Sequence, residues 1–213
     1  MGFNFTEAMA GTLLYPITDK HISGLSHAEQ VALLSSYGAT LIQLREKTDP
    51  PVKFFAQAAA ALRVARQCGA RIIINDRVDI ALALKADGVH LGQEDLAPEA
   101  ARRILGNDAI IGFSTHNLDQ ARLAAHIPID YIAVGPIFAT TTKQSATRAV
   151  GLEGLARIRE TISTLPLVAI GGITSENKDL VLQAGADVVA VIRDIWVPAA
   201  DAERKTKHFL KVP

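Results

Sequence analysis

A short stretch near residue 45 carries three side chains that together could bind an anion. Gln43, Arg45 and Lys47 alternate with other residues at the end of an apolar run that begins at Leu41. Alternate residues of a strand share a face, so the amide and the two cations should point the same way. Cations turned inward are costly without a negative partner. The pattern favours an anion site, and a diphosphate suits it because Arg binds such groups through two parallel hydrogen bonds. The alternative is an ordinary strand end with solvated charges.

Two acidic residues close later apolar runs and could complete such a site. Asp76 follows the run 71–75, and Asp95 follows the run 88–91. On adjacent strand ends beside a polyphosphate, two carboxylates are the hard ligands that Mg²⁺ uses, with phosphate oxygens and water completing its octahedron. Asn75 would add a neutral hydrogen bond to the same anion. The alternative interpretation makes both aspartates helix N-caps, because each stands just before a predicted helix.

A polar loop and a pair of glycines predict a second phosphate site. The long segment 135–150 contains the run Thr140-Thr141-Thr142-Lys143, whose hydroxyls, amides and single cation suit a phosphate group. Gly171-Gly172 follows another apolar run and would expose backbone amides, like the phosphate-binding loops after the last two strands of many barrels. An ordinary polar loop is the alternative for the threonine run.

Ser114 and His116 could suggest a nucleophile and its base, but the pattern around them does not support this chemistry. No Gly-x-Ser-x-Gly turn surrounds Ser114, and two residues two apart on a loop do not have triad spacing. Hydrogen bonding to a substrate is the better interpretation for Ser114. His116 is interpreted as a polar rim residue and His90 as a core or rim histidine with satisfied hydrogen bonds. No His or Cys spacing suggests zinc.

These residues need a scaffold, and the sequence predicts alternating strands and helices. The predicted strands are 13–18, 41–45, 71–75, 88–91, 110–113, 131–134, 167–170 and 188–192. The predicted helices are 28–37, 51–67, 78–84, 98–105, 118–126, 152–163, 176–184 and 201–210. Eight such units favour an α/β fold, a (β/α)₈ TIM barrel in one domain over residues 11–213, with its chemistry at the carboxyl ends of the strands. A doubly wound open sheet is the alternative. Residues 1–10 are predicted to be a leader or a short helix.

The composition sets bounds on compartment and partners. The chain has 22 basic and 22 acidic residues. The net charge is therefore zero and gives no indication of a nucleic-acid partner. The single cysteine, Cys68, excludes an intrachain disulfide and favours a reducing compartment. No apolar run reaches the roughly 18 residues of a membrane-spanning helix. We therefore expect a cytoplasmic protein that acts on small molecules without membrane attachment, with a homo-oligomer as an open alternative to a monomer.

Taken together, the motifs resemble the thiamine-phosphate synthase family over almost the whole chain. The segments that carry the resemblance include QLREK at 43–47, GVHLGQEDL at 88–96, IIGFSTHN at 110–117, DYIAVGPIFATTTK at 130–143, AIGGI at 169–173 and GADVVAVI at 185–192. The resemblance implies a TIM barrel that joins hydroxymethylpyrimidine diphosphate to a thiazole phosphate with Mg²⁺, releasing diphosphate.

The same resemblance implies roles for individual residues. The pyrimidine diphosphate would be bound by Gln43, Leu44, Arg45, Glu46, Lys47, Asn75, Ser114 and Lys143. The thiazole phosphate would be bound by Thr140, Thr141, Thr142, Gly172, Ile192 and Arg193. Asp76 and Asp95 would hold Mg²⁺, and Arg45, Lys47, Lys143 and Ser114 would act in catalysis.

One segment departs from the family pattern, and two alternative functions stay open. Arg193-Asp194 stands where the family often has Ser, so Arg193 would have to bind through its backbone or add a cation. A thiazole tautomerase of the same barrel family, with His116 as acid and base, is one alternative. A non-catalytic phosphate-binding regulator on the same fold is the other.

Overall fold

Short apolar runs form parallel strands buried on both faces, which is why the sequence shows continuous rather than alternating hydrophobicity. The computed structural model describes residues 5–9, 11–140 and 148–210, and within them eight strands form one sheet. The strands are β1 (Leu14–Thr18), β2 (Leu41–Leu44), β3 (Arg71–Asn75), β4 (Gly88–Leu91), β5 (Ile110–Thr115), β6 (Tyr131–Val134), β7 (Leu167–Ile170) and β8 (Val188–Val191).

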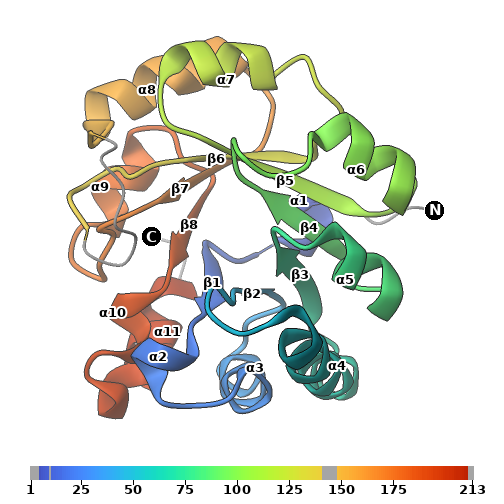
Figure 1. Ribbon diagram of the computed structural model, residues 1–213. Helices are drawn as coiled ribbons and strands as arrows, with labels where there is room; N and C mark the ends of the chain where they lie inside the picture. The colour runs from blue at the N-terminus through green and yellow to red at the C-terminus, as the bar shows by residue number, and fades with distance from the viewer. Residues whose placement is uncertain (1–4, 10, 141–147, 211–213) are drawn as a thin grey trace.

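The sheet closes on itself. Each strand pairs in parallel with the next, and β1 also pairs with β8, with Leu14 opposite Val189 and Pro16 opposite Val191. Figure 1 shows the strands at the centre with helices arranged around them. This closure confirms the predicted TIM barrel, and the open doubly wound sheet is excluded.

The helices cover the outside of the barrel close to the predicted ranges. They are α1 (Phe5–Ala8), α2 (Lys20–Ser23), α3 (His27–Ser36), α4 (Pro51–Cys68), α5 (Val78–Leu84), α6 (Pro98–Leu105), α7 (Leu118–Ala124), α8 (Gly151–Ile162), α9 (Lys178–Gln183), α10 (Arg193–Trp196) and α11 (Ala202–Leu210), with a 3₁₀ turn at Ala199–Asp201. The capping box of Ser26 and Glu29 starts α3. The sequence did not predict the one-turn helices α2 and α10, which follow β1 and β8.

Two apolar layers hold the barrel together. Alternate strand residues such as Leu14 and Ile72 face outward and pack under the helices. Their neighbours, among them Tyr15, Ile73 and Tyr131, face inward and fill the barrel. This alternation also settles which polar strand residues reach the interior.

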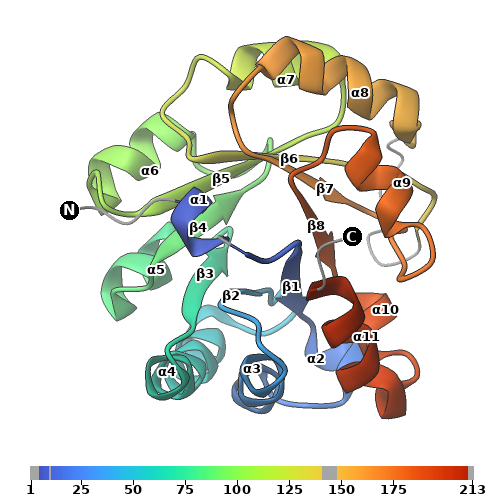
Figure 2. The ribbon, with the colours of Figure 1, turned by 180° about the vertical axis from the view of Figure 1, so that it is seen from behind.

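The amino-terminal segment packs against the base of the barrel. Residues 1–10 are predicted to be a leader or a short helix, and the structure has the short helix α1 there. Of the residues described in this segment, Phe5, Ala8 and Met9 are buried with the inward layer. Figure 2, seen from behind, shows α1 lying across this end of the barrel. Phe5 stacks on Tyr131 with 4.1 Å between ring centroids and meets Tyr15 edge-on. The segment therefore forms part of the barrel floor.

Among the described residues, none of the helices combines the length and apolarity that crossing a bilayer requires.

Candidate active site

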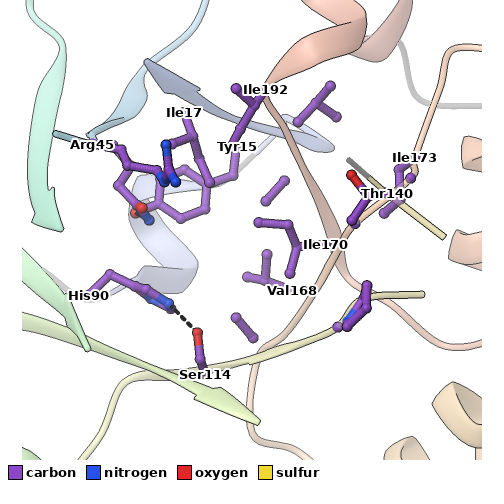
Figure 3. Close-up of a pocket in the computed structure, with 18 of the residues that line it drawn as sticks. Tyr15, Ile17, Arg45, His90, Ser114, Thr140, Val168, Ile170, Ile173 and Ile192 are labelled. Carbon is purple, nitrogen blue, oxygen red and sulfur yellow. Dashed lines mark hydrogen bonds between the residues drawn. The ribbon is translucent and has the colours of Figure 1, made fainter. Parts of the chain in front are cut away.

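A cavity of about 650 Å³ opens at the carboxyl ends of the strands. Its walls carry residues from β1 to β8 and from the loops that follow them. Figure 3 shows Arg45 and His90 on one side and Thr140 on another, with Ile17 and Ile170 among the apolar residues around them. The volume is that of a small-molecule site.

The end of β2 presents its predicted residues to this cavity. Gln43, Arg45 and Lys47 all line it. Gln43 Nε2 donates to the Tyr15 hydroxyl at 3.2 Å, and Arg45 Nη1 lies 2.6 Å from Asp19 Oδ2. Lys47 Nζ lies 2.5 Å from Asp76 Oδ2. The alternation predicted from the sequence thus places an amide and two cations around one space.

Leu44 and Glu46, which the family resemblance included in the substrate site, do not line the cavity. Leu44 is fully buried in the outward layer beneath the helices. Glu46 is 9% exposed and binds Lys20, with 2.9 Å between Oε2 and Nζ. Both residues follow the alternation that sends Gln43 and Arg45 inward, so their side chains point away from a ligand.

Glu46 instead holds the loop that carries the two cations. Its Oε1 accepts hydrogen bonds from the backbone N–H groups of Thr48, at 2.7 Å, and Asp49, at 3.0 Å. Burial opposes ionisation of the Glu46 carboxyl, but the hydrogen bonds from Lys20, Thr48 and Asp49 outweigh it, so its pKa lies well below the usual value. Glu46 is therefore a charged support for the loop.

Asp76 and Asp95 lie close enough for their carboxyl groups to interact directly. Burial raises the pKa of the Asp76 carboxyl, the hydrogen bond from Lys47 opposes that rise, and the neighbouring Asp95 carboxyl adds to it. Neither aspartate caps a helix: Arg77 and Ala97 occupy the N-cap positions of α5 and α6, without side-chain caps. The helix-capping alternative is therefore excluded for both.

This carboxylate pair fits a hard divalent cation that takes its other ligands from outside the protein. Within the described ranges, no three His, Cys, Asp or Glu side chains gather as a metal site. Asp95 Oδ2 already accepts the Gly92 N–H at 2.7 Å, which holds that carboxylate in place beside the cavity. Two carboxylates suit Mg²⁺, which keeps several waters and phosphate oxygens as ligands.

Asn75 provides an unused donor at the same end of the cavity. Its side chain is 6% exposed, and its Nδ2 is buried without a hydrogen-bond partner among the described residues. A buried amide left unsatisfied costs about 1–3 kcal/mol. Because Asn75 lines the cavity, a ligand that accepts a hydrogen bond there would remove this cost.

Ser114 and the two histidines line the cavity from β4, β5 and the start of the loop after β5. His90 Nε2 and Ser114 Oγ are 2.8 Å apart, as the dashed line in Figure 3 marks, and His90 Nδ1 lies 2.9 Å from the Tyr131 hydroxyl. His116 Nδ1 lies 2.5 Å from the carbonyl oxygen of Gly135.

The predicted second phosphate site is described in part. Thr140, Gly172, Ile192 and Arg193 line the cavity, whereas Thr141, Thr142 and Lys143 lie outside the described residues. Gly172 has φ of 68°. A Cβ atom there would lie 2.7 Å from the Phe138 side chain, so only glycine lets the two loops approach.

Arg193 and Asp194, which depart from the family pattern, have different surroundings. Arg193 is exposed at the cavity wall, and no described residue pairs with its guanidinium. Asp194 turns to the scaffold, with Oδ1 3.1 Å from Lys205 Nζ and Oδ2 accepting the Ser175 N–H at 3.0 Å. Arg193 thus contributes to the cavity wall, and Asp194 fixes the loops around it.

Sequence reasoning gave no role to several residues that shape the site. Tyr15 and Tyr131 lie within predicted strands and Asp19 directly follows the predicted strand 13–18, yet Tyr15 contacts Gln43 and Asp19 orients Arg45. The sequence around a tyrosine inside an apolar run does not indicate that its hydroxyl will contact the hydroxyl of another tyrosine. The position of Asp19 at a strand end was a usable signal, because such ends meet at one rim.

A TIM barrel whose cavity gathers an amide, cations and a carboxylate pair is the arrangement of a barrel enzyme that binds phosphorylated small molecules. The family model of thiamine monophosphate synthase (TMP-TENI) matches residues 14–195, and the chain belongs to this family.

Individual relatives agree with this assignment. A thiamine-phosphate synthase of Chloroflexus aurantiacus is 46% identical over 180 residues, covering 84% of this chain and 82% of the relative. One of Syntrophomonas wolfei is 41% identical over 200 residues, covering 93% and 95%. The structure of a thiamine phosphate pyrophosphorylase from Pyrococcus furiosus superposes with a TM-score of 0.83 at 37% identity, covering 93% and 94%. The predicted resemblance is confirmed.

Proposed function

We propose that this cavity joins hydroxymethylpyrimidine diphosphate to a thiazole phosphate, giving thiamine phosphate and diphosphate. Membership of the family and relatives named thiamine-phosphate synthase support a transferase of thiamine biosynthesis. The single observation in the structure that carries the proposal is the joint placement of Arg45, Lys47 and the Asp76–Asp95 pair around one cavity. Such a set binds a diphosphate together with its counter-ion.

The β2 side of the cavity is the diphosphate half in this proposal. Arg45 is held by Asp19 and Lys47 by Asp76, so both cations are positioned before the substrate arrives. The unsatisfied Nδ2 of Asn75 gains an acceptor when a phosphate oxygen binds. In this proposal, Gln43 Oε1 accepts from the amino group of the pyrimidine and its second N–H donates to a ring nitrogen, because Gln43 lines the cavity.

We propose that Asp76 and Asp95 hold Mg²⁺ on this diphosphate. The support is the closeness of the two carboxyl groups and the raised pKa of the Asp76 carboxyl, which burial raises first and the neighbouring Asp95 raises further against the opposing Lys47. When bound, the ion would neutralise part of the charge on the leaving diphosphate. Asp95 is held by the Gly92 amide and needs no rearrangement to serve as a ligand.

The β6 to β8 side is the thiazole-phosphate half. Thr140, Gly172 and Arg193 line this part of the cavity, and we propose that the Thr140 hydroxyl, the Gly172 amide and the Arg193 guanidinium supply donors and positive charge to the phosphate. From the sequence alone, we assign Thr141 and Thr142 to this half and Lys143 to the diphosphate half. The cation at Arg193 would substitute for the serine hydroxyl that the family often has there.

The reaction requires no protein nucleophile. The bond between the pyrimidine methylene carbon and the diphosphate oxygen breaks, and its electron pair leaves with the diphosphate. The amino-substituted ring stabilises the resulting cation, and the thiazole nitrogen donates its lone pair to form the new C–N bond. Arg45, Lys47 and Ser114 stabilise the charge that develops on the leaving group. No proton has to move to complete this balance.

Turnover of the purified chain tests the proposal. With both precursors and Mg²⁺, we expect thiamine phosphate and diphosphate in equal amounts, and neither when one precursor is omitted. Isomerisation of the thiazole phosphate without joining would support the tautomerase alternative. Binding of both precursors without any product would support the regulator. The cytoplasmic location and the possible homo-oligomer stay predictions.

A further inference from the structure

A continuous line of hydrogen bonds crosses the barrel beneath the cavity, from β2 to β5. Gln43 Nε2 donates to the Tyr15 hydroxyl at 3.2 Å, and that hydroxyl lies 3.1 Å from the Tyr131 hydroxyl. The Tyr131 hydroxyl lies 2.9 Å from His90 Nδ1, and His90 Nε2 lies 2.8 Å from Ser114 Oγ. We call these five residues the tyrosine–histidine chain. Both of its ends, Gln43 and Ser114, line the cavity.

The tyrosine–histidine chain is shielded from water except where it borders the cavity. Tyr15 and Tyr131 are at most 1% exposed, and Gln43 is 2% exposed. Gly112 makes room for the Tyr131 ring, since a Cβ there would lie 2.0 Å from Tyr131 Cζ. The Phe5 ring stacks on the Tyr131 ring and covers it. The hydroxyls therefore bond to each other rather than to solvent, and their geometry is fixed by packing.

The bonds in this line have a direction. Burial raises the pKa of both tyrosine hydroxyls, so each keeps one proton to donate. Because Tyr15 accepts from Gln43, its own proton goes to Tyr131, the other partner found for it in the described structure. Tyr131 then donates to His90 Nδ1. Because Nδ1 accepts this bond, the His90 ring carries its proton on Nε2 and donates it to Ser114 Oγ, so the Ser114 proton points into the cavity.

Rotating the Gln43 side-chain amide by half a turn, so that its carbonyl faces Tyr15, would reverse the donor and acceptor of every hydrogen bond in the tyrosine–histidine chain. Tyr15 would donate to the Gln43 carbonyl, His90 would carry its proton on Nδ1, and Ser114 would donate to His90. Ser114 would then show only lone pairs to the cavity and would repel an anion. The orientation of one amide on β2 thus decides whether a hydroxyl on β5 can donate to a ligand.

We propose that Tyr15, Tyr131 and His90 are positioning residues that couple recognition of an amino group at Gln43 to presentation of the Ser114 hydroxyl as a donor to the diphosphate. This inference rests on the proposed function for the identity of the two groups. A heterocycle with an amino group takes the Gln43 carbonyl as its acceptor and selects the donor state of Ser114. A heterocycle with an oxo group in that place favours the reversed amide and the acceptor state of Ser114. The tyrosine–histidine chain therefore discriminates between amino and oxo heterocycles more strongly than Gln43 or Ser114 would alone.

The proton position on His90 tests the direction without any substrate. In ¹⁵N NMR spectra of the labelled protein, with the His90 signals identified by their loss in His90→Asn, we expect a protonated Nε2 and an unprotonated Nδ1. Tyr131→Phe should give a mixture of both tautomers, whereas Tyr37→Phe, the same change at a tyrosine outside the chain, should keep the original pattern. A proton on Nδ1 of the unmodified protein would overturn the proposal.

Kinetics test the coupling. Tyr131→Phe should lower kcat/KM for the pyrimidine diphosphate in proportion to the share of His90 that no longer carries its proton on Nε2, which is about twofold for an equal mixture of the two tautomers. Adding Tyr131→Phe to Ser114→Ala should cause no further loss, because the tyrosine acts through the serine. Losses that multiply in the double variant would overturn the proposal.

A second variant keeps the test informative if Tyr131→Phe does not fold. Tyr15→Phe cuts the line between Gln43 and Tyr131, so Tyr131 still donates to His90 and the Nε2 tautomer is retained. The preference for amino- over oxo-pyrimidine diphosphates as inhibitors should fall, while in Tyr37→Phe it should not. Unchanged preference in Tyr15→Phe would contradict the coupling. Failure of the unmodified chain to form thiamine phosphate would instead contradict the proposed function, and the NMR result would still stand.

Discussion

Replacing Glu46 by Gln tests how the scaffold holds the diphosphate half of the cavity. Glu46 is buried, its Oε2 lies 2.9 Å from Lys20 Nζ, and its Oε1 accepts from the amides of Thr48 and Asp49. Glu46→Gln keeps one acceptor oxygen but turns an N–H group toward the Lys20 ammonium. Lys20 retains its ion pair with Asp49, so the loss is smaller than that for a buried charge left wholly unpaired.

The magnitude follows from the kind of bond removed. One buried hydrogen bond between charged groups contributes about 1.5–3 kcal/mol, so we expect the free energy of unfolding to fall by about 2–3 kcal/mol. For a chain of this size that lowers Tm by roughly 4–12 °C. Urea unfolding near pH 7 measures the loss, and Glu153→Gln, the same change at an exposed position of α8, should change stability by less than about 0.5 kcal/mol.

The pH dependence separates a lost charge from a general packing defect. The folded-state pKa of Glu46 lies below its unfolded value of about 4.3. Its contribution is therefore fully present above that value and is lost as the pH falls through the lower folded pKa. The difference between the two proteins should stay constant from about pH 7 to pH 5 and shrink below about pH 4. A difference that is absent at pH 7, or that does not shrink in acid, would refute this reasoning.

Three further substitutions have distinct expected results. Asp95→Asn should lower Mg²⁺-dependent turnover at least about 100-fold with an unchanged circular dichroism spectrum. Asp108→Asn, the same change at an exposed position, should leave turnover unchanged, and equal turnover in the two variants would contradict the metal assignment. Asn75→Leu removes an unsatisfied buried amide, so we expect stability to stay level or rise while KM for the pyrimidine diphosphate increases about tenfold; an unchanged KM would show that the amide has no ligand. Phe5→Ala should cost about 3–5 kcal/mol in urea unfolding because it leaves a cavity under Tyr131; a loss below about 1 kcal/mol would show that α1 does not seal the floor.

The sequence predicted the barrel because its signals are local and repeated. Apolar runs of four to six residues alternate with amphipathic helices, and the structure places the strands within a few residues of the predicted ranges. Strand alternation also predicted that Gln43, Arg45 and Lys47 share a face. The same rule, applied to Leu44 and Glu46, would have placed them outside the cavity, where the structure shows them.

Other features depend on contacts between distant positions and left no local signal. Asp76 and Asp95 could have been helix caps until the structure showed the N-cap positions occupied by Arg77 and Ala97. The Tyr15–Tyr131 hydroxyl contact joins residues 116 positions apart. Burial of Phe5 against that pair could not be foreseen either, because a phenylalanine near a chain end has the same sequence pattern in a loose segment as in a packed one.

The central claim is that one cavity holds two phosphorylated substrates in separate halves and joins them. A crossed measurement of KM tests it most directly, with Lys47→Met altering the diphosphate half and Gly172→Ala displacing the amide of the thiazole half. We predict that Lys47→Met raises KM for the pyrimidine diphosphate at least about tenfold with little change for the thiazole phosphate, and that Gly172→Ala does the reverse. If both variants raise KM for the same substrate, or if either raises both equally, the two-half arrangement is wrong.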